Sequence, residues 1–293
     1  MESRTGIGLT LLFHVLTHYT PYVFPVTDDS FCCSPTSMTI SAPLHFEVDP
    51  PELLGVENAD VHASSDEYAR RFLGGVGDWM LKTQENALTS MLPSHVRTVL
   101  DIGGGHGQIA LPLSRLGRSV TILGSSPVCA HRMRDEIENG SISFKCGNLV
   151  ELPFGDRSFD GVVSFRLMSH CTAWRRLIAE MCRVADSAVL FDYPVWCSSN
   201  ALTPLFFSIK RRIEGNTRSY TIFTTRELER EFRLHGFTRV AMRKQFFFPM
   251  GIHRALKRPG LSRMIEGVAR ALLLTKVFGS PVVIAFQRAA ADD

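Results

Sequence analysis

Hydrophobic positions along this chain fall into two alternating patterns. Short continuous apolar runs are bounded by polar or glycine residues, at residues 99–102, 119–123, 143–146, 161–165 and 187–193. Between them lie segments with apolar residues at helical spacing, at residues 108–116, 128–138 and 174–184. Short buried strands that alternate with amphipathic helices are typical of a parallel sheet covered on both faces. The pattern predicts an α/β, doubly wound fold.

The same periodicities extend to both sides of this region. A helix is expected from Ser64, with Ser64 or Ser65 as its cap, and it continues through residues 83–91. Gly74, Gly75 and Gly77 weaken its middle and favour a break into two helices. In the C-terminal third, the predicted helices are residues 201–213 and 226–235, and the predicted strands are residues 237–248 and 281–287.

A cluster of glycines follows the first strand. Val99-Leu100-Asp101-Ile102 runs directly into Gly103-Gly104-Gly105-His106-Gly107. Glycines let a ligand approach bare backbone, and the helix behind the turn offers unpaired N–H donors. The dinucleotide fingerprint G-x-G-x-x-G fails, because Gln108 stands where its third glycine would be. The turn therefore predicts a nucleotide-like ligand of another kind, and His106 is expected to shape the turn.

Polar segments follow the other predicted strands. In an open α/β sheet, ligands bind outside the carboxyl ends of the strands, so these segments are expected to converge on one crevice. They are Gly124-Ser125-Ser126, Asn148-Leu149 and residues 166–170. Arg166 is expected either to clamp a carboxylate or to pair with Asp160 or Asp192.

The glycine turn closely resembles the first motif of class I S-adenosylmethionine (SAM) dependent methyltransferases, because it reads Asp-x-Gly-x-Gly-x-Gly. The segment Gly147-Asn148-Leu149-Val150-Glu151-Leu152-Pro153-Phe154, followed by Ser158-Phe159-Asp160, is similar to a second segment of that superfamily. The resemblance covers about residues 97–193 and is nearest to ubiquinone/menaquinone-type methyltransferase domains. It implies a Rossmann-like sheet of about seven strands. The resemblance also implies that strand seven is antiparallel and lies between strands five and six. In this sequence a long insertion, expected to be helical, separates strands six and seven.

The resemblance also implies roles for individual residues. Asp101 would lie near the methionine ammonium of SAM, Asn148 would meet the adenine amino group, and Leu149 would pack on the ring. The full set of expected cofactor-binding residues is Asp101, Gly103, Gly104, Gly105, Gly107, Gly124, Ser125, Asn148, Leu149 and Phe165. His170 is the candidate base, because imidazole titrates near working pH. Tyr68, Arg166 and Tyr193 are the expected substrate contacts.

The chain departs from the family pattern at two positions. Gly124 stands where the family carries the acid that accepts from the ribose hydroxyls, and Asn148 stands where many relatives carry Asp. Ser125 or Ser126 could replace part of the lost contact, but a neutral hydrogen bond is weaker than a charge-assisted one. Weakened or altered SAM binding is therefore expected, and a methyltransferase-like binding protein that has lost catalysis is the alternative. An NAD(P)-dependent oxidoreductase is a further alternative, disfavoured by Gln108.

Composition narrows the class of protein. The 293 residues are 45% hydrophobic and 21% charged, and the net charge of +3 is too small to argue for nucleic acid by itself. No recognisable nucleic-acid-binding module is present. Seven cysteines without a C-x-x-C pair predict reduced thiols in a cytoplasmic protein and no metal site. Residues 1–60 are expected to be a poorly ordered extension, with Met38 a candidate start, and residues 61–293 the methyltransferase domain. Within it we expect a core at 95–195, a lid or substrate region at 196–280 and a last strand at 281–288.

The insertion at residues 249–280 is basic and amphipathic. Its cations are interspersed with apolar residues, and Glu266 is its one acid. It is interpreted either as a lid or dimer-packing helix, or as a cover for an apolar or anionic acceptor, with peripheral membrane contact as one form. Together with the helix from Ser64 it is expected to close over a small or lipid-like acceptor. The acceptor atom and the oligomeric state are not specified by the sequence.

Overall fold

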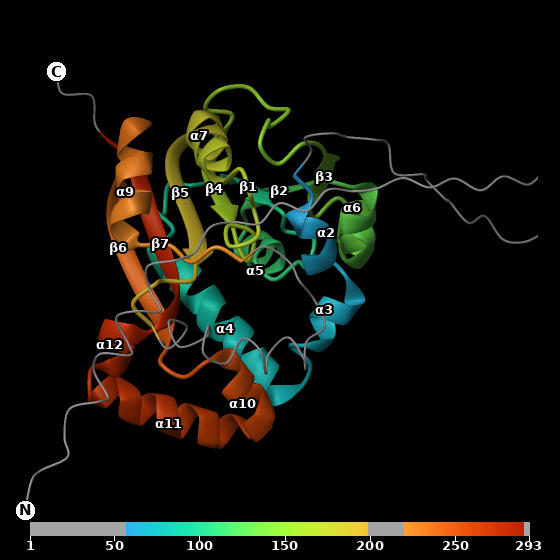
Figure 1. Cartoon of the computed structure of the whole chain (residues 1–293). Helices are drawn as coiled ribbons and strands as arrows, with labels where there is room; N and C mark the ends of the chain where they lie inside the picture. The colour runs from blue at the N-terminus through green and yellow to red at the C-terminus, as the bar shows by residue number, and fades with distance from the viewer. Residues whose placement is uncertain (1–56, 199–219, 290–293) are drawn as a thin grey trace, which may run out of the picture. The chain divides into compact units, whose positions relative to one another are not determined.

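The computed structural model describes residues 57–198 and 220–289 of the chain. Within them, seven strands form one sheet in the order β3-β2-β1-β4-β5-β7-β6 (Figure 1). The strands are β1 (Thr98–Ile102), β2 (Ser119–Gly124), β3 (Ser143–Cys146), β4 (Phe159–Ser164), β5 (Ala185–Tyr193), β6 (Phe237–Phe246) and β7 (Ser280–Arg288). Strands β1 to β5 pair in parallel, and β7 is antiparallel to both β5 and β6. The predicted fold class is confirmed.

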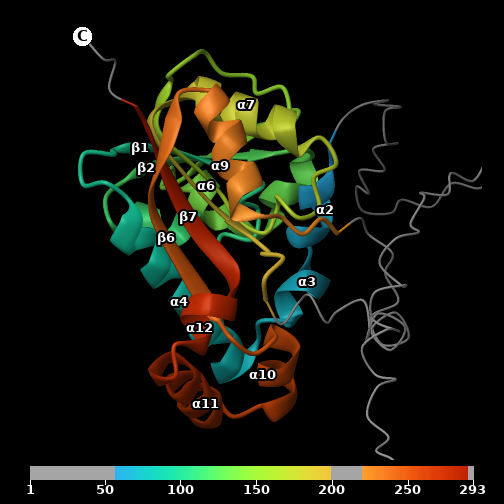
Figure 2. The ribbon, with the colours of Figure 1, turned by 60° about the vertical axis from the view of Figure 1, so that its left-hand side comes forward.

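Helices cover both faces of the sheet. One hydrophobic core lies between the sheet and the helices α7 (Trp174–Val184) and α9 (Thr225–Leu234). A second core lies on the other face, against α4 (Gly74–Met91) and α5 (Ala110–Arg115). Figure 2 shows α7 and α9 in front of the sheet and α4 behind it. Two cores on one sheet are what the two-sided apolar strands require.

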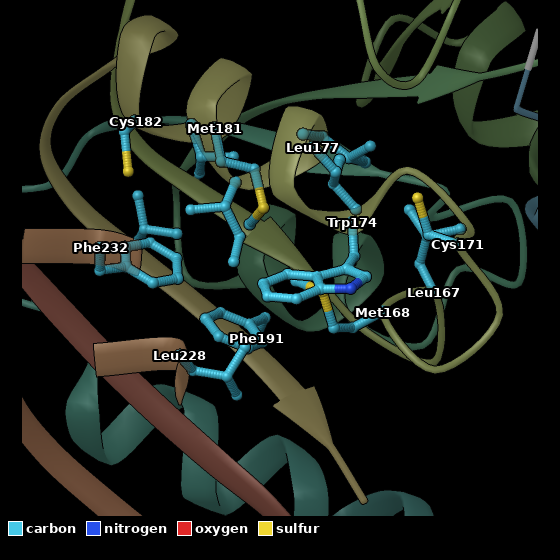
Figure 3. Packing of buried hydrophobic residues seen from close by; sticks show 14 of the residues in the cluster. Leu167, Met168, Cys171, Trp174, Leu177, Met181, Cys182, Phe191, Leu228 and Phe232 are labelled. Carbon is cyan, nitrogen blue, oxygen red and sulfur yellow. The ribbon is translucent and has the colours of Figure 1, made fainter. Parts of the chain in front are cut away.

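The side chains of β5 alternate between these cores. Val189 and Phe191 pack toward α7 and α9, while Ala188 and Leu190 face the core of α4 and α5. In Figure 3, Phe191 lies between Trp174 and Met181 of α7 and Leu228 and Phe232 of α9. Because successive side chains on a strand point to opposite faces, the side chains of Asp192 and Tyr193 at the end of β5 also lie on opposite faces of the sheet.

The N-terminal region contains three helices, α2 (Ala59–Ala63), α3 (Asp66–Arg70) and α4. The break expected near the glycines lies between α3 and α4, so that prediction is confirmed. Ser65 caps α3, with its side chain accepting a hydrogen bond from the Tyr68 amide at 3.2 Å. Gly74, at the start of α4, has φ +81°, a conformation that suits glycine.

The insertion between β6 and β7 forms α10 (Met250–Leu256), α11 (Pro259–Ala271) and α12 (Leu274–Phe278). It packs on α4 and the end of β6 through Val76, Met80 and Phe246. Glu266 is 1% exposed and accepts from the amides of Phe247 and Phe248 and from His253, at 3.0, 2.9 and 3.0 Å. These hydrogen bonds hold the pKa of Glu266 low against the opposing effect of burial. The acid of the insertion is thus a buried structural residue.

Element boundaries differ from expectation in one helix, and some predictions lie outside the described residues. Residues 128–138 form a 3₁₀ helix, η1 (Pro127–Met133), before α6 (Arg134–Glu138). The i→i+3 bond from the Cys129 amide to the Ser126 carbonyl at 3.0 Å begins that tighter winding. The extension up to residue 56 and the helix at 201–213 are not described. In the described part, no helix is long and apolar enough to cross a bilayer.

Candidate functional site

The carboxyl ends of the parallel strands bring the predicted polar segments together. The glycine turn follows β1, Gly124 ends β2, Asn148 follows β3, Arg166 follows β4 and Asp192 lies near the end of β5. Strand pairing in the order β3-β2-β1-β4-β5 places these ends along one edge of the sheet. The crevice at this edge is called the cofactor cleft below.

The glycine turn is tightly wound. Gly103 and Gly107 both have φ +73°, in the left-handed region that side chains disfavour. The Gly103 amide donates to the Leu123 carbonyl at 2.8 Å and so fixes the turn to the end of β2. At Gly104, a Cβ would collide with the carboxyl of Asp101. The glycines therefore make room for Asp101 as well as for a ligand.

Asp101 is a buried acid whose carboxyl is left unpaired. The residue is 1% exposed, and neither carboxyl oxygen has a hydrogen-bond partner among the described residues. Burial raises the pKa of Asp101 to about 7. An unsatisfied buried polar group costs about 1–3 kcal/mol, so a fold that keeps one at a glycine turn points to a ligand that donates to it. A ligand ammonium group fits this carboxyl.

A polar network connects Asp101's neighbours to α4. Asp192 accepts from the Arg166 amide at 2.6 Å and from Gln84 Nε2 at 3.2 Å. Gln84 Oε1 accepts from Arg166 at 3.0 Å and from Gln108 at 2.5 Å. Arg166 has φ +63° and is held in this strained conformation by the network. Asp192 thus contacts the Arg166 backbone amide, while the guanidinium donates to Gln84. Asp160, the other partner expected for Arg166, accepts from the amides of Arg97 and Thr98.

Aromatic rings from α3 and the following turn pack against this network. The Arg166 guanidinium lies 3.9 Å from the centroid of the Phe72 ring and 5.8 Å from that of Tyr68. The His106 ring makes edge contacts with both rings, at 5.8 and 6.1 Å. Burial lowers the pKa of His106 to about 3, so it is a neutral ring packed in the turn, as its predicted shaping role requires.

Helix α2 fills the space in front of the glycine turn. Asp60 is 0% exposed, and its carboxylate accepts from the amide and the hydroxyl of Ser125, at 2.8 and 2.5 Å, and from Cys129 Sγ at 3.3 Å. Ser64 sits so close to Gly105 that a Cβ there would collide with its hydroxyl. The cavity that remains beside Asp101 is about 20 Å³. Ligand sites span about 300–1,000 Å³, so α2 leaves much less space beside Asp101 than such a site has.

The other predicted cofactor-binding residues lie along the same edge. Asn148 Oδ1 accepts from the Val150 amide at 3.1 Å and shapes its own turn. Leu149 is buried in the core at 0% exposed, and Phe165 borders the small cavity at 7% exposed. Gly124 has no room for the acid that the family carries, because a Cβ would lie 2.7 Å from Cys129 and 3.0 Å from Phe144.

The predicted substrate and catalytic residues are not all brought together. Tyr68 and Arg166 lie at the cleft, as described above. His170 follows β4, and its ring lies 5.6 Å from that of Tyr220. Tyr193 points into the core on the α7 side of the sheet, where its hydroxyl is 2.8 Å from Thr225 Oγ1. Its side chain is therefore on the opposite face from Asp192 and Gln84.

Two residues of the site were not predicted. Gln84 had a signal in the sequence, because Met80, Gln84 and Leu88 recur at four-residue spacing and place a polar side chain on a buried stripe. Asp60 had none, since α2 has five residues and is too short to show a period. It was assigned to the poorly ordered extension, whereas the structure buries it.

Comparisons with known proteins agree with this geometry. Residues 99–187 match a family described as "Methyltransferase domain". A demethylmenaquinone methyltransferase of Deinococcus radiodurans is 30% identical over 149 residues, 46% of this chain and 62% of that protein. A probable chloroplastic tocopherol O-methyltransferase of Oryza sativa subsp. japonica is 30% identical over 119 residues, 39% of this chain and 33% of that protein. The chain thus spans less than two thirds of either relative.

Solved structures share the fold at lower identity. A Haloferax volcanii protein described as a putative methyltransferase, in complex with a methyltransferase activator, has a TM-score of 0.56 and 20% identity, covering 80% of this chain and 99% of its own. Magnesium protoporphyrin IX methyltransferase of Synechocystis, solved with bound SAH, has a TM-score of 0.50 and 14% identity. The match covers 76% of this chain and 94% of that protein's chain. These similarities concern the fold alone.

Proposed function

Because this chain carries a class I S-adenosylmethionine-dependent methyltransferase domain, we propose that it transfers the methyl group of SAM to a small or lipid-like acceptor. The domain match, the strand order with antiparallel β7 and the converging strand ends support this function. The single observation that carries it is Asp101, a buried acid with an unpaired carboxyl beside bare glycine backbone.

The chain's own residues fit the chemistry of the cofactor. Asp101 would bind the ammonium group of the cofactor, and Ser125 would bind its ribose hydroxyls. The turn from Gly103 to Gly107 would let the cofactor lie directly against the protein backbone. Asn148 and Leu149 would form the adenine side of the cleft, and Phe165 would border its Asp101 end. When bound, SAM supplies a methyl group on a sulfonium, and holding donor and acceptor in line provides much of the rate enhancement.

Around the reacting centre, the network of Gln84, Asp192 and Arg166 would orient the acceptor. The strained Arg166 points its guanidinium toward Phe72 and Tyr68, which form an apolar and aromatic wall for a ring-shaped or lipid-like molecule. His170 would take the acceptor proton if the acceptor is a hydroxyl or an acidic carbon. The two relatives are named as a demethylmenaquinone methyltransferase and a probable tocopherol O-methyltransferase, and these names support hydroxylated ring compounds as the first acceptors to test.

Calorimetric titration of the full chain with SAM, SAH and NADH tests the cofactor. We expect binding of SAM and SAH and none of NADH. Asp101→Ala should weaken SAH binding about 10- to 150-fold, because a hydrogen bond to a charged group contributes about 1.5–3 kcal/mol. The matched control is Asp135→Ala, which removes an exposed acid of α6. Equal SAH affinity in wild type and Asp101→Ala would contradict the assignment.

Turnover separates the enzyme from a methyltransferase-like binding protein that has lost catalysis. The closed cleft and Gly124 are the observations that favour this second candidate. SAH release in the presence of quinols and phenols would exclude it. For His170→Gln, a base role predicts kcat lower by about 10²–10⁴ with unchanged SAH affinity. SAH binding without turnover on any acceptor would favour the binding protein.

A further inference from the structure

A second and much larger cavity lies away from the cofactor cleft. It has a volume of about 1320 Å³ and is bounded by α4, the edge strand β6 and the helices α11 and α12. Figure 1 shows α4, α11 and α12 below the sheet, near the lower end of β6. We call this cavity the basic groove. The basic groove shares no lining residue with the small cavity beside Asp101. Helix α4 borders the groove, but its Gln84 side chain faces the cofactor cleft and not the groove.

The lining of the basic groove is strongly cationic. Its charged lining residues are Lys82, Arg243, Lys244, Arg263, Arg270 and Lys276, with Asp78 as the acid. Lys82 is paired with Glu85 at 2.6 Å. The remaining cations have no carboxylate within ion-pair distance in the part of the chain that the structure describes. Partial burial lowers the pKa of Lys244, whose ammonium donates to the Val277 carbonyl at 2.5 Å. Unpaired cations gathered in a groove favour an anionic ligand.

The groove also contains buried polar side chains without partners. Gln245 is 1% exposed, and neither Oε1 nor Nε2 has a hydrogen-bond partner within residues 57–198 and 220–289. Thr275 is 4% exposed, and its hydroxyl is likewise unsatisfied among those residues. Leaving such groups unpaired costs free energy, so their presence in a cation-lined groove indicates hydrogen bonds reserved for a ligand. The unpaired amide and hydroxyl thus point to a ligand independently of the positive charge of the groove.

We propose that the basic groove is a binding site for a phosphate-bearing ligand. Arg263 and Arg270 present planar guanidinium groups that match phosphate oxygens in pairs, while Gln245 and Thr275 supply neutral hydrogen bonds. The groove is far larger than a phosphate group, so the phosphate belongs to a larger molecule. Trp79 and Met242, which also line the groove, provide apolar contact for the remainder.

Two sources share this phosphate chemistry, a free phosphate ester and a lipid headgroup. Beside the groove, Met264 and Val268 of α11 and Leu272, the residue that caps its C-terminal end, are 60, 56 and 65% exposed. Their four-residue spacing places them on one stripe, while Arg263 and Arg270 lie on the side of the helix that borders the groove. An apolar stripe beside a phosphate site suits a headgroup in a bilayer, whereas a free ester would leave the stripe in water.

The test is titration of the full chain with inorganic pyrophosphate. We expect saturable binding, weakened about tenfold or more by the double variant Arg263→Gln/Arg270→Gln, because charge-assisted hydrogen bonds are lost. Gln245→Leu should also weaken it while preserving the fold, since it removes an unsatisfied buried amide. The control Arg176→Gln/Arg233→Gln removes the same charge from exposed sites on α7 and α9 and should bind as wild type. SAH affinity, measured on every variant, should not change.

Vesicles distinguish the two sources. Binding to phosphatidylcholine vesicles containing phosphatidylglycerol, displaced by pyrophosphate and weakened by the Arg263/Arg270 double variant, would identify a lipid headgroup. Pyrophosphate binding without vesicle binding would identify a free phosphate ester, and both results support the site. The absence of pyrophosphate binding, or equal loss in the control double variant, would overturn the proposal. Because SAH binding is scored separately, this failure is distinguishable from failure of the methyltransferase function.

Discussion

Replacing Asp60 tests whether α2 competes with the cofactor. The carboxylate of Asp60 anchors α2 across the cofactor cleft through Ser125 and Cys129. With α2 in place, the cavity beside Asp101 is about 20 Å³. We expect SAH to bind the molecules in which α2 has moved, so that its apparent affinity falls in proportion to the fraction of molecules with an open cleft. Asp60→Ala should raise that fraction.

The expected magnitude follows from the two hydrogen bonds donated by Ser125. Hydrogen bonds to a charged group contribute about 1.5–3 kcal/mol each, and burial of the carboxylate offsets part of that sum. A net loss of about 1.5–3 kcal/mol of anchoring corresponds to about 10- to 150-fold tighter SAH binding. The gain ends once the open form predominates, since no further population can then be shifted.

The assay is SAH titration of wild type, Asp60→Ala and Asp66→Ala. Asp66 is the matched control, because its carboxylate lies on α3 and pairs with Arg132 at the surface. Hydrogen exchange at the Ser64 amide, bonded to the Asp60 carbonyl at 2.9 Å, should accelerate when SAH is added. Weaker SAH binding by Asp60→Ala would refute the reasoning and would mean that Asp60 itself contacts the ligand, in place of the acid missing at Gly124.

Three further predictions concern other parts of the molecule. Burial raises the pKa of Asp101 to about 7, and only its carboxylate attracts an ammonium group. SAH affinity should therefore rise about tenfold from about pH 6 to about pH 8 and level off above, and titrations of Asp101→Asn should lose this dependence. Gly124→Asp should lower Tm without improving SAH binding, because a side chain there overlaps Cys129 at a cost of about 1–3 kcal/mol; tighter binding would contradict this. Glu266→Gln should destabilise the fold by about 1–3 kcal/mol in denaturant unfolding, because its amide nitrogen cannot accept the hydrogen bonds that the buried carboxylate accepts from Phe247, Phe248 and His253. The control Glu138→Gln, on exposed α6, should not.

The sheet could be predicted because its signals are local. Residues 143–146 and 174–184 were expected as a strand and a helix and have those bounds as β3 and α7. Glycines 103 to 107 marked the turn, since left-handed backbone conformations favour glycine regardless of tertiary context. These features depend on short-range sterics and periodicity, which a single sequence contains.

The arrangement of the cleft depends on contacts between distant segments. Gln84 meets Asp192 across 108 positions of sequence, and Asp60 meets Ser125 across 65. No local pattern specifies such pairs. The orientation of Tyr193, in contrast, follows from a local pattern. Strand alternation puts its side chain on the same face as Phe191 and on the opposite face from Asp192. That alternation was present in the sequence and argued against a substrate contact for Tyr193.

The departure from the family pattern at Gly124 and the position of α2 are linked through Ser125. Without an acid at Gly124, the amide and hydroxyl of Ser125 remain as donors at the end of β2, and a ribose would find no carboxylate there. Cys129 and Phe144 fill the space of the missing side chain, so the acid cannot be supplied from that position. Asp60 supplies a carboxylate from α2 and takes both Ser125 donors. Any ligand that uses those donors must displace Asp60, which couples cofactor binding to the release of α2.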